Sequence, residues 1–198
     1  MKKIPTLLRR DPDNRAKVLD EVTPGCEWVM AGDGRPTRKY DGVCVLIVIG
    51  RLIHLSAGER IITGYVRRNV KPGKPTPDGF IHVETDPVTG ITFGWEPVHG
   101  TGFHRFFEEA VTNHNGAEMG PLVDGTYELC GPRINGNPEG LDQHLLFSHD
   151  RAETVGFALD HPLGFQELRE GVALLAPWEG VVWHHDDGRM AKLKRRDL

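Results

Sequence analysis

The sequence predicts an α+β fold in which antiparallel strands predominate, on three observations. Short apolar runs of strand length recur along the 198 residues, and clusters of Gly, Pro, Asn and Asp separate them. Only two segments, 103–112 and 165–175, have the apolar spacing of a packed helix. There is no internal repeat, low-complexity segment or clear linker, so one domain over residues 1–198 is expected.

The elements are expected to follow one another closely. Residues 1–24 predict a short helix with a turn at 11–14, and residues 27–30 predict a strand. One long strand, 38–49, contains the most apolar run of the chain. The remaining predictions are strands at 52–55, 60–66, 80–84, 91–95, 126–130, 145–147, 181–183 and 190–193, and loops rich in Pro and Gly at 70–79 and 131–140.

The composition limits the classes of protein to which the chain can belong. Hydrophobic residues make up 38% and charged residues 26%, and no apolar run is long enough to span a bilayer. Three cysteines without metal-type spacing, and no signal peptide, predict a cytoplasmic protein with reduced thiols and no membrane partner. The net charge of −4 argues against general binding of polyanions, although residues 67–74 and 192–196 are basic enough to meet RNA.

Lys39 stands directly ahead of the apolar run 43–49. Lysines seldom go inside a protein unless they are paired or functional. A lysine held partly out of water near other cations loses its proton more readily and becomes a nucleophile. The plainer alternative is a lysine at the end of a strand whose amine reaches solvent.

Other charged residues follow Lys39 in a fixed order. Glu128 and Glu179 each lie in a short predicted strand, and alternation puts Lys192 and Lys194 on one face of the last strand. With Lys-Tyr-Asp-Gly at 39–42, these residues resemble motifs I, III, IV and V of the covalent nucleotidyltransferases. That superfamily contains the ATP-dependent DNA and RNA ligases and the capping guanylyltransferases.

Three stretches sharpen the resemblance. Residues 67–74, 127–140 and 192–197 are similar to a small RNA ligase family that includes the vertebrate 5′–3′ RNA ligase. DNA ligases commonly place an arginine after motif I, where this chain has Val43, which favours the RNA branch. The resemblance implies a nucleotidyltransferase (ATP-grasp-like adenylation) domain. Because the sequence ends four residues after Lys194, no OB-fold domain is expected.

The resemblance implies a role for each matched residue. Lys39 would be the nucleophile that carries AMP, and Glu179 would bind Mg²⁺, or Mn²⁺ in its place. Nucleotide contacts would come from the ribose ligand Glu128, the α-phosphate ligands Lys192 and Lys194, Arg67 or Arg68 as the arginine of motif Ia, and the backbone near Arg38. Lys71 and Lys74, further out on the loop at 70–79, would contact the RNA backbone.

The implied activity is ATP-dependent joining of RNA 5′-phosphate and 3′-hydroxyl ends through a lysyl-AMP intermediate, by a monomer. Two alternatives stay open. One is a capping-type guanylyltransferase or another nucleotidyl transferase. The other is a nucleotide-binding module in which these residues serve structure alone.

Several residues admit a second interpretation. The segment 184–187, His-His-Asp-Asp, resembles a metal site, but adjacent residues on a strand point to opposite faces, so a hairpin tip is expected. Glu96 is interpreted as a strand-end charge rather than an acidic group near the nucleotide. Phe147 is interpreted as core rather than as an adenine stack, and helical spacing places Phe106 and Phe107 in a helix core.

Overall fold

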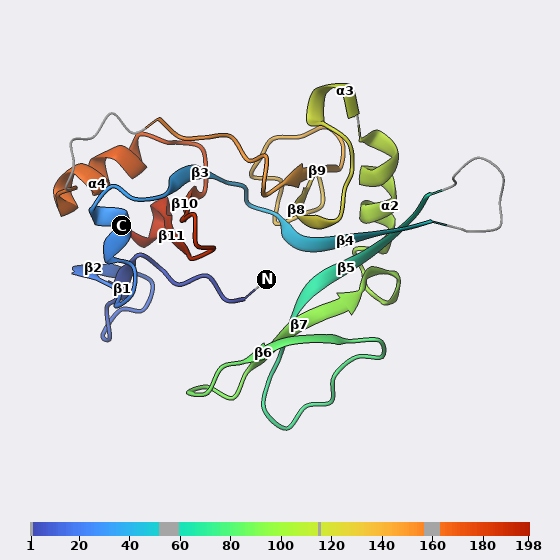
Figure 1. The fold of residues 1–198 in the computed structure, drawn as a ribbon, viewed down its shortest axis with the longest axis horizontal. Helices are drawn as coiled ribbons and strands as arrows, with labels where there is room; N and C mark the ends of the chain where they lie inside the picture. Colours follow the sequence, from blue (N-terminus) through green and yellow to red (C-terminus); the bar gives the residue numbers. More distant parts are fainter. Residues whose placement is uncertain (1, 52–59, 115, 157–162) are drawn as a thin grey trace. The chain divides into compact units, whose positions relative to one another are not determined.

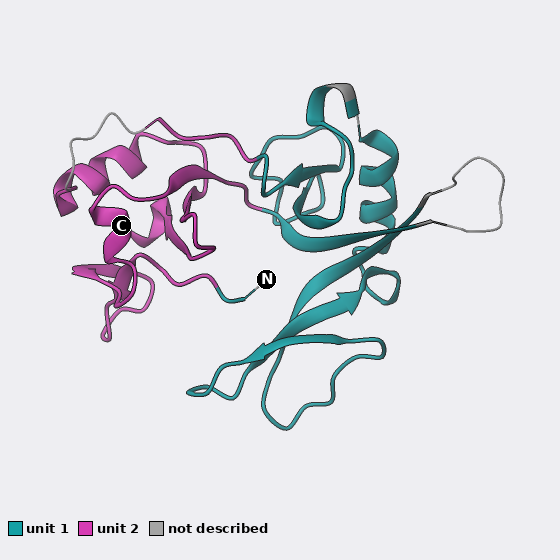
Figure 2. Ribbon diagram, in the orientation of Figure 1, with its two compact units in different colours: residues 1–3, 42–151 teal, residues 4–41, 152–198 magenta. Residues whose placement is uncertain are grey.

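The fold was analysed in a computed structural model, which describes residues 2–51, 60–114, 116–156 and 163–198. The chain forms two compact units (Figure 2). Unit 1 comprises Met1–Lys3 and Gly42–Arg151, and unit 2 comprises Ile4–Asp41 and Ala152–Leu198. The main segment of unit 1, Gly42–Arg151, is therefore inserted between two segments of unit 2. The single adenylation domain over 1–198 stays a prediction.

Unit 1 is built on a six-stranded sheet in which every neighbouring pair is antiparallel (Figure 1). The strand order is β6-β7-β5-β4-β8-β9. The strands are β4 (Val43–Arg51), β5 (Arg60–Val70), β6 (Ile81–Thr85), β7 (Thr92–Pro97), β8 (Gly125–Cys130) and β9 (Leu145–Ser148).

One face of this sheet carries the core of unit 1. Val45 and Ile47 on β4 and Val66 on β5 are buried with Phe107 of α2 (His104–Asn113). A Cβ at Gly64 would lie 2.4 Å from the Phe107 ring, so glycine lets the helix approach the sheet closely. The opposite face of the sheet carries the side chains that alternate with these, and Glu128 and Arg67 lie on it. The remaining helices of unit 1 are η1 (Val98–Gly100) and α3 (Gly116–Met119).

Unit 2 is built on a three-stranded antiparallel sheet with the order β11-β10-β3. Val181 and Leu193 point to the buried side, where they pack with Leu168 and Trp28. Both edges of the sheet are covered by other segments, because residue 155 bonds to the β3 edge and residue 7 to the β11 edge. The elements are β1 (Leu8–Arg10), β2 (Val18–Val22), α1 (Glu27–Met30), β3 (Arg35–Lys39), α4 (Phe165–Ala173), β10 (Gly180–His184), β11 (Met190–Lys194) and η2 (Arg195–Asp197).

Two predictions near the N-terminus are wrong. Residues 1–24 contain a β1–β2 hairpin instead of a helix, although the turn at 11–14 is confirmed, with Asp11 Oδ1 accepting backbone hydrogen bonds. Residues 27–30 form α1 instead of a strand. The neighbours Trp28 and Val29 are both buried, which a helical turn allows and an alternating strand does not.

The prediction of one long strand over 38–49 is also wrong in one respect. It breaks at residues 40–42 into β3 and β4, which belong to different sheets and different units. The predicted strands at 60–66, 80–84, 91–95, 126–130, 145–147, 181–183 and 190–193 and the two long helices are confirmed within a few residues, whereas 52–55 lies outside the described residues.

The antiparallel α+β class is confirmed, while the nucleotidyltransferase assignment of the fold stays a prediction. The helices of the described residues are all too short or too polar to span a bilayer.

Candidate active site

Three charged side chains of unit 2 meet at one end of its sheet. The register places Lys39, Gly180 and Lys194 in one row across β3, β10 and β11. Glu179 directly precedes Gly180. One of its carboxylate oxygens accepts a hydrogen bond from Lys39 Nζ, and the other accepts one from Lys194 Nζ. The two lysines and the carboxylate therefore form a tight charged cluster.

The cluster is largely removed from solvent. The side chain of Glu179 is 5% exposed, and those of Lys39 and Lys194 are each 18% exposed. Desolvation is the largest single influence on Glu179 and acts to raise its pKa, but the charge of Lys39 and hydrogen bonds from Lys194 and Lys39 together outweigh it. The pKa of Glu179 consequently lies below its usual value, and the carboxylate is ionised at neutral pH.

Lys192 occupies the next row of the same sheet face. It pairs across the sheet with Val182, which in turn pairs with Thr37 on β3. Leu193, between the two lysines, is fully buried in the core. The prediction that Lys192 and Lys194 share one face is confirmed. Of these two, Lys194 is the lysine that the described ion pairs join to Glu179.

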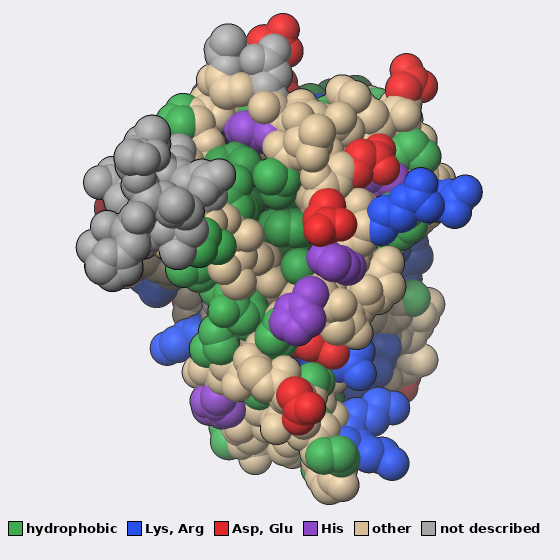
Figure 3. All heavy atoms as spheres, turned by 90° about the vertical axis from the view of Figure 1, so that its right-hand side faces the viewer, with side chains coloured by type: hydrophobic (Ala, Val, Ile, Leu, Met, Phe, Trp, Pro, Cys, Tyr) green, Lys and Arg blue, Asp and Glu red, His purple; other side chains and the backbone are tan. Residues whose placement is uncertain are grey.

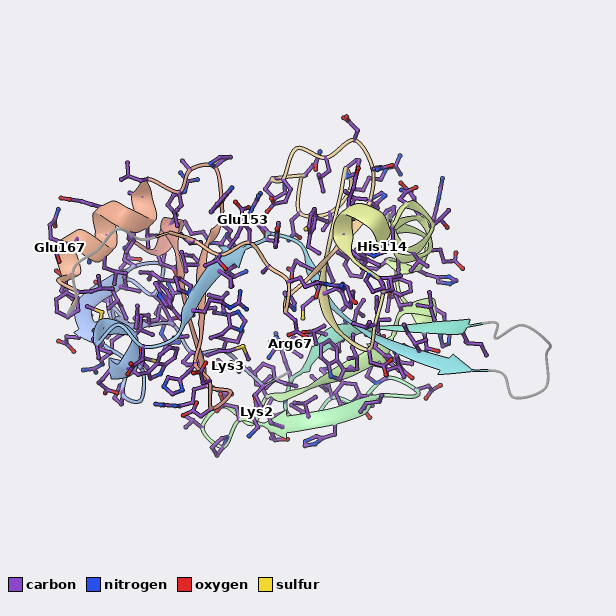
Figure 4. All side chains as sticks on the ribbon, turned by 45° about the horizontal axis from the view of Figure 1, so that its top comes forward. Lys2, Lys3, Arg67, His114, Glu153 and Glu167 are labelled. Atoms are coloured by element: carbon purple, nitrogen blue, oxygen red, sulfur yellow. The ribbon has the colours of Figure 1, made fainter. Side chains whose placement is uncertain are left out.

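Arg38 is held by aromatic rings in unit 2. Its guanidinium carbon lies 4.7 Å from the ring centroid of Tyr40 and 4.7 Å from that of Trp178, a double cation–π contact. Its guanidinium also lies 3.6 Å from the carboxylate of Glu153, which Figure 4 labels. The backbone N–H of Arg38, which the resemblance assigns to adenine, donates to the carbonyl of Glu153.

Glu128 lies in β8 of unit 1 and is 8% exposed. Its Oε1 accepts a hydrogen bond from the backbone N–H of Gly42 at 3.1 Å, and its Oε2 lies 3.1 Å from His149 Nε2. A Cβ at Gly42 would lie 2.3 Å from the carbonyl oxygen of Leu129, so the glycine of the Lys-x-Asp-Gly motif is the residue that fits against β8. Glu128 is therefore anchored on both of its oxygens.

The two candidate arginines lie inside β5 rather than after it, and they point to opposite faces of the sheet. Arg67, labelled in Figure 4, lies over the ring of Phe93 at 5.4 Å. Arg68 lies 3.6 Å from the carboxylate of Glu96, which supports the interpretation of Glu96 as a paired strand-end charge. Their opposite directions mean that at most one of the two can share a face with Glu128, and the register gives that position to Arg67.

The loop between β5 and β6 carries Lys71 and Lys74, both exposed, on a turn closed by the hydrogen bond from Lys74 N–H to the Lys71 carbonyl. Phe147 pairs with Glu128 across β8 and β9 and is half-buried. Phe107 is buried in the α2 core, as predicted. Phe106 is partly buried and packs against the same core, and its ring stacks on His144 at 4.5 Å.

Several other polar side chains pair with one another. Residues 184–187 form the predicted hairpin tip between β10 and β11, and Asp187 contacts both His185 and Arg189 there. Figure 3 shows histidine and acidic side chains next to one another on a face of unit 1. Two such pairs on or beside α2 are His104–Glu108 at 3.2 Å and His144–Glu109 at 2.9 Å.

The candidate residues thus form two groups, one in each unit. Unit 2 brings Lys39, Glu179 and Lys194 into contact, and unit 1 holds Glu128 on the sheet face opposite α2. The sequence analysis assigns no role to the side chains of His149, Tyr40 and Trp178. His149 meets Glu128 only through the register of β8 and β9, which periodicity alone does not reveal.

A lysine beside a buried carboxylate and a second lysine defines, as a class, a candidate site for an anionic phosphate group. Known proteins point the same way. The chain is 31% identical over 156 residues to RNA ligase 1 of Danio rerio, a match that covers 64% of this chain and 43% of the relative. RNA ligase 1 of Mus musculus is 28% identical over 155 residues, with the same coverage.

RNA ligase 1 of Pongo abelii is 27% identical over 155 residues. The resemblance to the vertebrate RNA ligase family is confirmed by these matches. The chain spans less than half the length of the curated relatives it matches. No protein-family profile matches the chain.

Proposed function

We propose that this chain is the nucleotidyltransferase part of an ATP-dependent RNA ligase. The observation that carries the proposal is Glu179, buried and ionised, with Lys39 on one carboxylate oxygen and Lys194 on the other. The similarity to proteins named RNA ligase 1 supports the substrate class. RNA with 5′-phosphate and 3′-hydroxyl ends would be the substrate, and ATP would supply the AMP group.

In the first step Lys39 Nζ attacks the α-phosphorus of ATP, forming a nitrogen–phosphorus bond as the bond to pyrophosphate breaks. The attacking amine must be unprotonated, and contact with an ionised carboxylate favours the ammonium form. Lys39 must therefore leave Glu179 and lose its proton before it attacks. Lys194 remains charged beside the phosphate and offsets the negative charge that builds up in the transition state.

Glu179 fits a divalent cation, because its carboxylate is ionised and Mg²⁺ is held in such sites by few carboxylates together with phosphate oxygens and water. Bound there, Mg²⁺, or Mn²⁺ in its place, would neutralise phosphate charge. In a second step AMP passes from Lys39 to the RNA 5′-phosphate, and in a third the RNA 3′-hydroxyl displaces AMP. In this proposal Glu128 and Arg67 contact the nucleotide, and Lys71 and Lys74 contact the RNA.

Labelling with α-³²P ATP or GTP tests the proposal. Wild type should acquire a covalent AMP label that peptide mapping assigns to Lys39, and Lys39→Ala should lose it. The matched control, Lys17→Ala, removes an exposed lysine of the same unit and should label normally. A GMP label would point to a capping-type transferase, and the absence of any label would point to a binding module.

The roles of the two glutamates can be separated in the same assay. Glu179→Ala should reduce self-adenylation by about 100-fold or more, because an electrostatic group at the reacting phosphate is lost. Glu128→Ala should chiefly reduce the preference for ATP over 2′-deoxy-ATP. Equal responses of both variants to Mg²⁺ concentration and to 2′-deoxy-ATP would contradict this division of roles.

A further inference from the structure

Unit 1 contains a second cluster of reactive side chains that the proposed nucleotide chemistry does not use as a set. A thiol, a carboxylate and an imidazole come together at Cys44, Glu128 and His149. Their ligand atoms, one from each residue, all lie within 4.8 Å of one another. We propose that this cluster is a binding site for Zn²⁺ or a similarly soft divalent cation.

The sheet register builds the cluster. Cys44 on β4 pairs directly with Glu128 on β8, so their side chains stand on the same face. His149 follows β9, and its backbone N–H continues the ladder by donating to the carbonyl of Thr126 on β8. The three ligands thus come from β4, β8 and the residue that follows β9, which are neighbours in one sheet.

The distances suit a tetrahedral ion. Two ligand atoms at 2.0–2.1 Å from a tetrahedral Zn²⁺ are separated by roughly 3.4 Å. His149 Nε2 and Glu128 Oε2 already lie 3.1 Å apart. The sulfur of the half-buried Cys44 lies within 4.8 Å of a ligand atom of each of these two residues, and rotation of its side chain can complete a three-ligand set. The fourth position would be left for water.

Groups around the cluster orient two of its ligands. His149 Nδ1 lies 3.0 Å from Thr126 Oγ1, a partner that can hold the ring while Nε2 coordinates. Glu128 Oε1 is held by the N–H of Gly42, which leaves Oε2 to face His149. Outer partners of this kind are typical of metal ligands, whereas a simple ion pair between Glu128 and His149 does not require a thiol beside it.

The ligand types select the ion. Thiolate and imidazole favour Zn²⁺, whereas Mg²⁺ prefers sites made only of oxygen atoms. Binding converts the Cys44 thiol to a thiolate and releases its proton to solvent, so affinity should rise with pH. The Mg²⁺ proposed for Glu179 and the softer ion proposed here would therefore occupy different ligand sets.

Metal titration of the complete chain, without nucleotide, tests the site. Chelator-stripped protein should bind one Zn²⁺ with unchanged affinity in excess Mg²⁺, and Co²⁺ in its place should give the near-ultraviolet absorption of a cobalt–thiolate bond. Cys44→Ser and His149→Gln should each weaken Zn²⁺ affinity by about 100-fold or more, and Thr126→Val by roughly 10–100-fold. Cys26→Ser and His104→Ala, which alter a thiol and an imidazole elsewhere, should bind as wild type does.

A measurement on unaltered protein guards against misfolded variants. Zn²⁺ should protect Cys44 from alkylation, as read by mass spectrometry, while the thiols of Cys26 and Cys130 are buried with or without it. Absence of Zn²⁺ binding, a Co²⁺ complex without the thiolate absorption, or unchanged affinity in Cys44→Ser would overturn the proposal.

One consequence rests on the proposed function. Because Glu128 cannot bind both an ion and a ribose through Oε2, Zn²⁺ should weaken ATP binding in wild type and less so in Cys44→Ser. If Zn²⁺ binds without affecting ATP, the metal site stands and the ribose role of Glu128 is wrong. If Zn²⁺ weakens ATP binding equally in both proteins, it acts on ATP binding at a site other than Cys44, and the proposed competition at Glu128 is wrong.

Discussion

Glu179 shows how single residues set the chemistry of unit 2. Its carboxylate is buried between two lysines, and removing one partner of a buried ion pair leaves the other charges poorly compensated. The same arrangement holds the Lys39 amine against the Glu179 carboxylate. In the proposed reaction Lys39 would therefore have to break a contact that contributes to the stability of unit 2.

Glu179 makes the stability of the protein depend on pH. Because its pKa is lower in the folded than in the unfolded chain, the ionised group stabilises the fold above its unfolded-state pKa, and this contribution is lost as pH falls through the lower folded-state pKa. Glu179→Gln should cost on the order of 3 kcal/mol at neutral pH, with a smaller cost in acid. Thermal unfolding from pH 7 down to the acid range measures both effects.

Glu21→Gln serves as the control, since it removes a carboxylate from the exposed pair with Arg9. It should change stability by about 1 kcal/mol or less. If Glu179→Gln loses the same stability at every pH, the pKa of Glu179 is not lowered in the folded protein.

At the scale of elements, the break between β3 and β4 is the feature that the sequence hides. The apolar run after residue 42 suggests one continuous strand, and only tertiary contacts divide it. A Cβ added at Gly42 would lie only 2.3–2.9 Å from atoms of Leu129, Cys130 and Glu128. The small size of this residue is therefore needed at the start of β4.

Gly42→Ala should destabilise unit 1 by about 1–3 kcal/mol, because the added methyl group displaces the backbone of β8. Gly50→Ala is a matched control at the other end of β4, where a Cβ would meet its nearest atom, Ile61 Cβ, at 3.9 Å. Urea unfolding of both variants, followed by circular dichroism, compares them. Equal stabilities would show that β8 yields easily at this position.

The loop between β5 and β6 gives a second prediction at this scale. Lys71→Ala combined with Lys74→Ala should leave self-adenylation intact but slow RNA sealing, because phosphate contacts are lost. The dependence of sealing on salt should become shallower by roughly one unit of log–log slope per lost contact. Single-turnover sealing by adenylated enzyme at several salt concentrations measures this, with Lys2→Ala, an exposed lysine outside the loop, as control.

Sequence reasoning was strongest for the longer elements. The helix carrying Phe107 and the strands after residue 60 follow from periodicity and turn residues alone. The four residues of α1 are too few for periodicity to separate a helix from a strand. Motif order predicts Lys39, Glu179 and Lys194 as site residues, and the structure brings them into contact. The neighbours His149 and Trp178 depend on packing between distant segments.

At the scale of the whole molecule, the two units have separate cores. Leu168 belongs to the core of unit 2 and Ile47 to that of unit 1, and both are fully buried. A hydrophobic core responds to a cavity within it more than to one elsewhere. A cavity made in one core can therefore test whether the two units open separately.

Leu168→Ala and Ile47→Ala should each cost about 2–5 kcal/mol, because each leaves a cavity in a packed core. Native-state hydrogen exchange should show faster opening of amides in the altered unit, with slower amides of the other unit less affected. Uniform loss of protection across both units in each variant would show that the chain unfolds as one body.

The insertion of unit 1 within unit 2 has a consequence for synthesis on the ribosome. Lys39 emerges early, but Glu179 and Lys194 come after the whole of Gly42–Arg151. At roughly 5–20 residues per second, an interval on the order of ten seconds separates Lys39 from its partners. Late in that interval unit 1 has its full sequence, whereas unit 2 still lacks β10 and β11. The lysine on which the proposed reaction depends thus acquires its charged neighbours only after the whole of Gly42–Arg151 has been translated.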